Sequence, residues 1–466
     1  MRPMLTLLLV LGSSTSLRGA MFVYVSMAPE QKIQVYRLDP TEGKLTAVDA
    51  VSVKGAPGAL AVDPERQFLF ASLRTSSTLA SFRIDPATGK LKLLGTAPLP
   101  KGENAAYVGT DRTGRWVLSA SYAAGKVVIH RIKDDGTIQS PAVQTVETAK
   151  TAHCAVTDRG NRFVFVPHVT PNAVYQFRLD TASGKLTDAG KAKGGADRAG
   201  PRHLAFHPTL DLAFTSDEEG SSITAYRFDA AKGLKPVQTL STLPPDFKGE
   251  NTTAEVKVHP SGKFVWVSNR GHDSLAGFAI DAHTGKLTAL GQTPTEKTPR
   301  SFDVSPDGRF VLAAGEGSGK LAVYEVDLAT GKLTRRHTYD VGKSLTWVLA
   351  IDDQIHGQLR DALRATAPYI EKLDRGARVL EDLKESNQKQ AEDLKALLAK
   401  ERADRPGDGW GLAAPFINGA AWLFTEAPWW VVVLVVLAVL ACGVAGTYSA
   451  LHSEEKKRPW WRFWSR

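Results

Sequence analysis

The chain has 466 residues, of which 43% are apolar and 23% are charged, and its formal net charge at pH 7 is +9. This length allows a large core and more than one domain, and the composition excludes a mainly disordered chain. A basic chain can bind nucleic acid, but no zinc-finger spacing, helix-turn-helix pattern or RNA-binding signature is present, so we expect no nucleic-acid partner.

The first 20 residues, MRPMLTLLLVLGSSTSLRGA, combine one early arginine with a short apolar core. This is the pattern of a signal peptide, although its cleavage site is poor. The alternative is that residues 1–20 are a wrongly assigned start of the chain, because the similarity to other proteins described below begins only at Met21.

Residues 21–352 contain seven similar units whose opening apolar runs start 46 to 52 residues apart, at Phe22, Phe68, Trp116, Phe163, Leu212, Phe264 and Phe310. Each run precedes an alternating strand, and five units then carry a turn ending in GKL, whose glycine we expect at positive φ. Four short strands per unit, without any helical pattern, predict an all-β fold, a seven-bladed β-propeller. A β-sandwich is the alternative, but it does not require such regular spacing.

Equivalent positions of propeller blades form a ring around one axis, so residues far apart in sequence become neighbours. The seventh residues of the opening runs form the first ring: Ala28, Arg74, Tyr122, Val169, Glu218, Arg270 and Glu316. The residues five before the Asp, His or Ser of each closing turn form the second ring: Gly58, Ala106, His153, Arg202, Ala254, Arg300 and Trp347.

The two rings gather four arginines, two glutamates and one histidine at one mouth of the predicted propeller. Guanidinium groups bind carboxylate or phosphate, and histidine with glutamate can transfer protons near neutral pH. This predicts an anion-binding pocket with acid and base groups; the alternative is a structural ion-pair network that fills the channel. Cys154 follows His153 on a strand and should face away from it. No histidine pair has convincing metal-ligand spacing, so we expect no metal.

Five long segments between Met21 and Ile351 carry a family resemblance: FVYVSMAPEQKIQVYRLD, AGPRHLAFHP, LPPDFKGENTTAEVKVHPSGKFVWVSNRGHDS, TPRSFDVSPDGRFVLAAG and VGKSLTWVLAI. They resemble the bacterial 6-phosphogluconolactonases of the β-propeller type, in the lactonase family that also includes propeller muconate-lactonizing enzymes. The resemblance implies a site of one histidine, two arginines and one glutamate, without metal or cofactor. The matching residues are His153 in TAHCAV, Arg202 in GPRH, Glu218 in SDEEG and Arg270 in SNRG.

The implied reaction is hydrolysis of a sugar-phosphate lactone, 6-phosphogluconolactone, to 6-phosphogluconate. His153 would act as general base on water, with Glu218 orienting the water or sharing the proton. Arg202 and Arg270 would stabilise the oxyanion. The expected substrate-binding residues are Arg74 and Arg300 for the phosphate, with Tyr122 and Glu316.

Two features leave this assignment open. Asp217 stands where the family has Asn, and Glu219 is a second candidate for the glutamate. The same residues would permit another lactone or a muconate-type acid as substrate, and a membrane-tethered binding scaffold without catalysis is a further alternative.

Beyond Ile351 the composition changes. Residues 355–402 are rich in Lys, Glu, Leu and Ala, with apolar positions three and four apart. This predicts a helical stalk, either a single amphipathic helix or a coiled coil that forms a homodimer through residues 370–400. Residues 403–428 are expected to form a linker or an interfacial segment.

Residues 429–450 carry no charge and are long enough to span a bilayer as one transmembrane helix. Trp429, Trp430 and Tyr448 mark its ends in the way of interfacial aromatic residues, and residues 451–466 form a basic, aromatic tail. The positive-inside rule places this tail in the cytoplasm and favours an extracytoplasmic propeller, in agreement with the leader. A cytoplasmic propeller is the alternative, because the substrate of the resembled enzymes is made in the cytoplasm.

Overall fold

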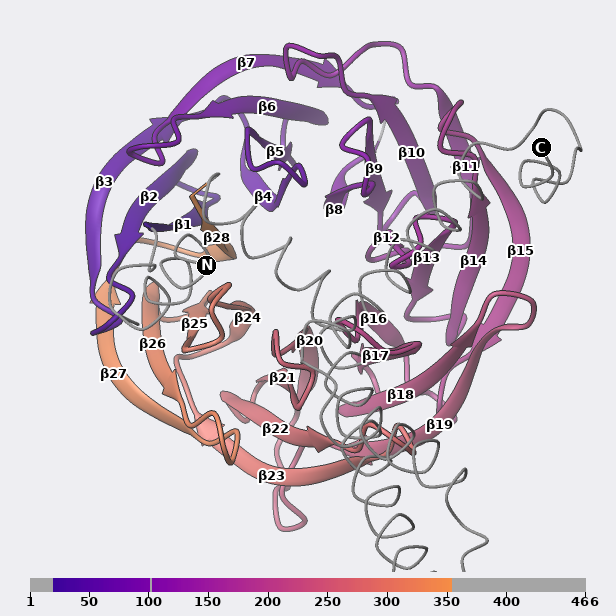
Figure 1. Ribbon diagram of the computed structural model, residues 1–466, viewed down its shortest axis with the longest axis vertical. Helices are drawn as coiled ribbons and strands as arrows, with labels where there is room; N and C mark the ends of the chain where they lie inside the picture. Colours follow the sequence, from indigo (N-terminus) through magenta and orange to yellow (C-terminus); the bar gives the residue numbers. More distant parts are fainter. Residues whose placement is uncertain (1–19, 101–102, 354–466) are drawn as a thin grey trace, which may run out of the picture. The chain divides into compact units, whose positions relative to one another are not determined.

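The computed structural model describes residues 20–100 and 103–353 of the chain. In these residues, 28 strands form seven four-stranded antiparallel sheets that surround one axis (Figure 1). The predicted all-β, seven-bladed propeller is therefore confirmed. The expected leader up to residue 19, the stalk, the linker, the transmembrane helix and the tail lie outside the described residues. Within the described ranges, no helix is long and apolar enough to cross a membrane.

Each blade contributes its innermost strand to the axis and places its second strand directly outside it. The innermost strands are β4 (Pro57–Val62), β8 (Ala105–Thr110), β12 (Val156–Thr157), β16 (Pro201–Phe206), β20 (Thr252–Val258), β24 (Pro299–Val304) and β28 (Leu345–Asp352). The second strands are β1 (Met21–Met27), β5 (Phe68–Leu73), β9 (Trp116–Ser121), β13 (Phe163–His168), β17 (Leu212–Asp217), β21 (Phe264–Arg270) and β25 (Phe310–Gly315).

The third and fourth strands form the outer half of each blade. The third strands are β2 (Lys32–Leu38), β6 (Thr78–Ile84), β10 (Lys126–Arg131), β14 (Ala173–Leu179), β18 (Ser222–Asp229), β22 (Ser274–Ile280) and β26 (Lys320–Val326). The outermost strands are β3 (Leu45–Ser52), β7 (Leu91–Pro98), β11 (Gln144–Glu147), β15 (Leu186–Lys193), β19 (Gly233–Ser241), β23 (Leu287–Pro294) and β27 (Leu333–Asp340).

The ring is closed by strands from the two ends of the propeller. β28 pairs antiparallel with β1, with Met21 opposite Asp352 and Val25 opposite Val348. We number this sheet blade 1 and the sheets that begin with β4, β8, β12, β16, β20 and β24 blades 2 to 7. The sequence unit is thus offset from the blade by one strand, because the last strand of each unit becomes the innermost strand of the next blade.

The recurrent GKL turns behave as hairpin turns. Their glycines have φ between 70° and 74°, a left-handed conformation that favours glycine, at Gly43, Gly89, Gly184, Gly285 and Gly331. A Cβ on Gly89 would collide with the ring of Phe22 in the preceding blade, and one on Gly184 would collide with Trp116. The glycine therefore serves both the turn and the close contact between neighbouring blades.

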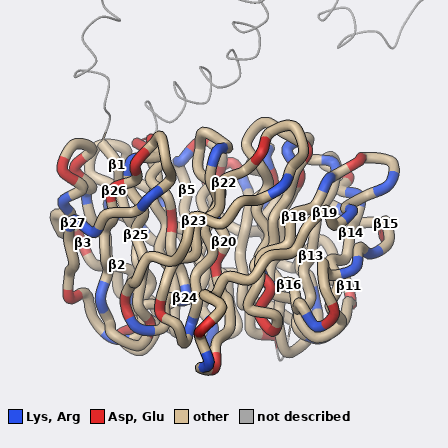
Figure 2. Tube along the Cα trace, turned by 90° about the horizontal axis from the view of Figure 1, so that it is seen from below, with Lys and Arg blue, Asp and Glu red and all other residues tan. Residues whose placement is uncertain are grey.

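The core lies between the blades. Phe214 and Phe278, from blades 5 and 6, belong to one cluster of buried residues, and Leu118 and Val164 link blades 3 and 4 in the same way. Burying one such aromatic or aliphatic side chain stabilises the fold by about 1.5–3 kcal/mol. The second strands of the blades are buried and mainly apolar, and acidic and basic residues lie interspersed at both ends of the propeller (Figure 2).

Two histidines of the closing turns also join blades. Nε2 of His207 donates a hydrogen bond to the carbonyl of Gly262 at 2.9 Å, and Nε2 of His259 donates to that of Gly308 at 2.9 Å. Both rings are buried. They hold neighbouring blades together.

Candidate active site

The charged and histidine positions of the two rings lie at the same end of the propeller, whereas the side chain of Trp347, from the second ring, lines a different cavity. Each innermost strand starts where the second strand of its blade ends, because the two strands are antiparallel. Pro201 pairs with Asp217 in blade 5, and Pro299 pairs with Gly315 in blade 7. The residues that follow these positions therefore meet around one mouth of the channel.

A cavity of about 190 Å³ opens at this mouth. Its lining consists of Arg74, Asn104, Ala106, Tyr122, Ala123, His153, Glu218, Arg270 and Arg300. Six of the eight site residues expected from the sequence are among them. The other two, Arg202 and Glu316, do not line the cavity but form ion pairs with residues that do. The volume is below the roughly 300–1,000 Å³ of pockets for drug-sized ligands, which fits a small metabolite.

Glu218 is held between two arginines. Nη2 of Arg270 donates to Oε1 of Glu218 at 2.6 Å, and Nε of Arg202 lies 3.4 Å from Oε2, an ion pair without hydrogen-bond geometry. Burial raises the pKa of Glu218, but the charges of Arg202 and Arg270 outweigh it, so the net pKa lies below the usual value. The carboxylate is therefore ionised at neutral pH and has a fixed position.

Arg202 is a buried support, and only 1% of its surface is exposed. Its Nη1 donates to the carbonyl of Ala254 in blade 6 at 2.7 Å. Burial, together with repulsion from Arg270 and Arg300, lowers the pKa of Arg202 to about 9. The guanidinium therefore stays charged at neutral pH. It forms an ion pair with Glu218 but does not itself line the cavity.

Arg270 has a different position, because it both supports Glu218 and faces the cavity. Its Nη2 also donates to the carbonyl of Thr253 at 2.9 Å, within its own blade. These two contacts fix the guanidinium at the cavity wall.

The remaining two arginines, Arg300 and Arg74, have weaker contacts with carboxylates or none. Arg300 lies 3.7 Å from Glu316, both side chains being partly exposed. Arg74 donates from Nε to Oδ1 of Asn104 at 2.9 Å, and within the described part of the chain it forms no ion pair. Burial and the nearby Arg300 lower the pKa of Arg74. A cation without a carboxylate partner is suited to bind an anionic group of a ligand.

His153 contributes the neutral base of the cavity. Its side chain is buried, with 5% exposed, and its ring packs edge to face against Tyr122 with centroids 5.5 Å apart. Burial, followed by the charge of Arg202, lowers the pKa of His153 well below that of an ordinary histidine. Burial and the charge of Glu218 raise the pKa of Tyr122, so its hydroxyl stays protonated. The cavity thus combines a basic nitrogen, a carboxylate and a hydroxyl donor.

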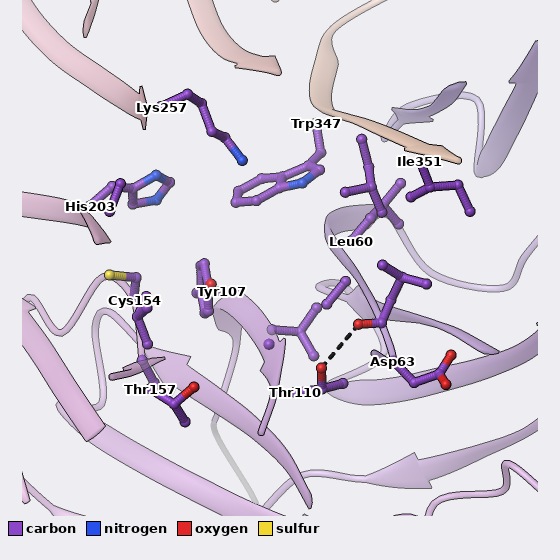
Figure 3. Close-up of a pocket in the computed structure, with 18 of the residues that line it drawn as sticks. Leu60, Asp63, Tyr107, Thr110, Cys154, Thr157, His203, Lys257, Trp347 and Ile351 are labelled. Carbon is purple, nitrogen blue, oxygen red and sulfur yellow. Dashed lines mark hydrogen bonds between the residues drawn. The ribbon is translucent and has the colours of Figure 1, made fainter. Parts of the chain in front are cut away.

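A second, larger cavity of about 620 Å³ lies at the other end of the channel. His203, Lys257, Trp347 and Tyr107 point into this space from different strands (Figure 3). Two of the polar side chains that line it have partners on neighbouring strands: Lys257 lies 3.3 Å from Asp303, and His203 lies 2.9 Å from Glu255.

Cys154 lines the larger cavity, whereas His153 lines the smaller one. The two residues do not share a pocket, as predicted, although they precede β12 (Val156–Thr157) and do not lie on a strand. Burial raises the pKa of the Cys154 thiol, which disfavours the reactive thiolate. Among residues 20–100 and 103–353, no group of three or more His, Cys, Asp or Glu side chains could hold a metal ion.

The ring positions did not include three residues that belong to this region. Asn104 holds Arg74, and His203 with Glu255 lies beneath His153. Asn104 is two positions before Ala106 of the second ring. A search for polar residues just before each innermost strand would therefore have found it. His203 directly follows Arg202 on β16.

Comparison with known proteins agrees with the fold. Residues 22–350 match the family model described as lactonase, 7-bladed beta-propeller. The 6-phosphogluconolactonase of Yersinia pestis (strain Pestoides F) is 34% identical over 283 residues, which cover 60% of this chain and 83% of that protein. The 6-phosphogluconolactonase of Pectobacterium carotovorum subsp. carotovorum (strain PC1) shows the same identity and coverage.

Solved structures share the fold. The periplasmic gluconolactonase of Pseudomonas aeruginosa superposes with a TM-score of 0.67 at 24% identity, covering 72% of this chain and 99% of that one. A protein from Lactobacillus plantarum superposes with a TM-score of 0.64 at 26% identity, covering 72% of this chain and 100% of that one. The family match spans most of the chain and all seven blades, and the chain therefore belongs to the lactonase family of seven-bladed β-propellers.

Proposed function

We propose that this chain hydrolyses 6-phosphogluconolactone to 6-phosphogluconate. Membership of the lactonase family supports a hydrolase that acts on a lactone ester, and relatives at 34% identity are named 6-phosphogluconolactonase. The observation that carries the proposal is the mouth cavity, which is lined by His153, Glu218 and three guanidinium groups.

His153 is the general base in this scheme. Its lowered pKa keeps the imidazole neutral, so a ring nitrogen is free to accept a proton from water at neutral pH. The water oxygen attacks the lactone carbonyl carbon while His153 takes its proton, and Glu218 orients the water. The ring C–O bond then breaks as the carbonyl re-forms, and the imidazolium returns the proton to the leaving alkoxide.

Arg270 stabilises the oxyanion that develops on the carbonyl, because its guanidinium faces the cavity and is already fixed by Glu218 and Thr253. Arg202 was expected to share this task. Its 1% exposure leads us to propose instead that it acts through Glu218, whose position it secures.

Arg74 and Arg300 bind the phosphate of the substrate. Both line the cavity, and Arg74 has no carboxylate partner in the described residues. Glu316 orients Arg300 at 3.7 Å, and the Tyr122 hydroxyl donates to a sugar oxygen. Since guanidinium groups supply the positive charge, the proposed reaction uses no metal and no cofactor.

The test is an assay of the purified full-length chain with 6-phosphogluconolactone, δ-gluconolactone and muconolactone, each corrected for spontaneous hydrolysis. The proposal expects the highest kcat/KM for the phosphorylated lactone. A preference for either of the other two would reassign the substrate, and no acceleration with any of them would remove the enzymatic function.

We also propose that residues 429–450 attach the propeller to a membrane, on the extracytoplasmic side. The uncharged stretch and the basic tail after it support this. Deleting residues 429–466 should move the protein from the membrane fraction to the soluble fraction, and protease added to intact cells should degrade the propeller of the full chain. Protection from the protease would place the propeller in the cytoplasm.

A further inference from the structure

The ring of His153 packs against the ring of a second histidine, His203. The ring centroids of His153 and His203 are 4.9 Å apart, and the rings meet edge to face at 68°. Tyr122 packs against His153 in a similar way at 5.5 Å. The imidazole of His153 therefore packs between the side chain of Tyr122, which lines the mouth cavity, and the side chain of His203.

His203 itself has a fixed orientation. Its Nδ1 lies 2.9 Å from Oε1 of Glu255, and both residues are buried, each with 3% of its surface exposed. Trp347 and Tyr107 pack against the same ring, with centroids at 5.7 Å and 5.9 Å. Figure 3 shows His203, Trp347 and Tyr107 around one space. The contact with Glu255 and the two ring contacts together favour one orientation of the His203 ring.

The charge of Glu255 determines which His203 nitrogen carries the proton. Burial raises the pKa of Glu255, but His203 and Lys257 outweigh this effect and lower it, so the carboxylate is ionised. An ionised carboxylate only accepts hydrogen bonds, so Nδ1 of His203 must be the protonated nitrogen. Burial lowers the pKa of His203 to about 4, and the ring is neutral at pH 7. Its Nε2 is then an unprotonated acceptor.

Each of the two histidines has one buried ring nitrogen that makes no hydrogen bond within the described residues: Nε2 of His203 and Nδ1 of His153. Because the two rings meet edge to face, the imidazole of His203 is close enough to attract a proton on Nδ1 of His153. That tautomer leaves Nε2 of His153 unprotonated, which is the form that a general base requires.

We propose that the Glu255–His203 pair is a positioning unit for His153, which selects the tautomer with its proton on Nδ1 and keeps Nε2 available to the mouth cavity. The pair acts as the orienting group of a base does in catalytic triads, here through a second imidazole. The tautomer is a property of the fold itself. Only its effect on the rate rests on the proposed lactone hydrolysis.

A merely structural role is the competing explanation, because Glu255 and His203 lie on the innermost strands of neighbouring blades, β20 and β16. In that case, changes at either residue would lower stability without altering His153. The experiment must therefore measure the tautomer and the rate, and not only folding.

Three variants of the full chain make the test: His203→Phe, which keeps a ring but removes both nitrogens; Glu255→Gln, which removes the charge with little change of volume; and His130→Phe, a control at a buried histidine on β10. Nitrogen NMR of labelled histidines reports tautomers, and His153→Asn identifies the His153 signals. We expect the Nδ1–H form of His153 in the wild type and in His130→Phe, and a mixture of tautomers in the other two.

In the lactone assay, kcat should fall by roughly 10–100-fold in His203→Phe, by analogy with the range found for groups that orient metal-ligating histidines. It should fall less in Glu255→Gln, and KM should change little in either. Glu255→Gln carries the test if His203→Phe does not fold. An unchanged His153 tautomer and an unchanged kcat in the folded variants would overturn the proposal. If the wild type has the expected tautomer but hydrolyses no lactone, the proposed function fails while the positioning stands.

Discussion

Arg270 of blade 6 donates a hydrogen bond to Glu218 of blade 5, with 2.6 Å between Nη2 and Oε1. The contact joins residues 52 positions apart in the chain, and it exists because Glu218 directly follows β17 and Arg270 ends β21, the second strands of adjacent blades. The candidate site is thus a product of the interface between blades, and changes to this pair should affect chemistry and stability together.

Replacing Glu218 by Gln removes the charge that compensates Arg202 and Arg270. We expect kcat/KM for 6-phosphogluconolactone to fall by about 10²- to 10⁴-fold, the range for lost acid-base assistance. Leaving buried arginine without its carboxylate should also cost about 1–3 kcal/mol of unfolding free energy. Enzyme kinetics and urea denaturation measure the two effects. Glu219→Gln, at the exposed neighbour, is the matched control and should behave as the wild type.

Arg74 should distinguish phosphorylated from unphosphorylated lactones. In Arg74→Gln we expect the KM for 6-phosphogluconolactone to rise by about 10–100-fold, corresponding to about 1.4–2.7 kcal/mol of lost binding. The kcat should change little, since Arg74 does not contact the reacting carbonyl in the proposed scheme. Kinetics with δ-gluconolactone provide the control. An equal effect on both substrates would show that Arg74 does not bind phosphate.

The pH dependence follows from the lowered pKa of His153. An ordinary histidine would lose half of its basic form near pH 6.5, whereas His153 stays neutral there. We therefore expect kcat/KM to remain level from pH 8 to below pH 6.5. A loss of half the activity near pH 6.5 in the folded enzyme would contradict the burial of this ring.

The same pKa shift has a consequence for stability. The unfolded chain binds a proton at its histidines below about pH 6.5, while folded His153 and His203 resist protonation. The unfolded state thus binds more protons in this range, and the free energy of unfolding should decrease as the pH falls below 6.5. Denaturation at pH 7.5 and pH 5.5 checks the sign, and His153→Asn should show a smaller decrease.

Closure of the ring by β28 should be required for folding. A chain that ends at residue 344 lacks Leu345, Val348 and Ile351, buried side chains that each contribute about 1.5–3 kcal/mol. Their sum is comparable to the roughly 5–15 kcal/mol by which a typical domain is stable. Thermal unfolding should show no cooperative transition for this chain. A chain that ends at residue 353 keeps β28 and should unfold cooperatively.

The sequence predicted the fold because the signal is periodic: seven apolar runs and five GKL turns point to the same architecture. It also predicted six of the residues that line the mouth cavity, since equivalent positions of a closed ring share one end. The ring positions could not show that the Arg202 side chain turns toward the carbonyl of Ala254 and becomes buried. That direction depends on the hydrogen-bond acceptors of the neighbouring blade.

The Glu255–His203 pair was missed for a related reason. Both residues lie inside innermost strands, where a charged or polar side chain is expected to be rare, and each gains its partner only across blades 5 and 6. Asn104 lies in an irregular segment before β8, so no periodic pattern assigns its contact with Arg74.

The most direct test of the account compares the steady-state hydrolysis of 6-phosphogluconolactone by the wild type and by His153→Asn, with thermal unfolding as the check on folding. The account predicts clear acceleration by the wild type and a fall in kcat of at least about 10²-fold in a variant that still folds. Equal rates for the two folded proteins would contradict the claim that the two rings of residues form a lactone-hydrolysing site around His153.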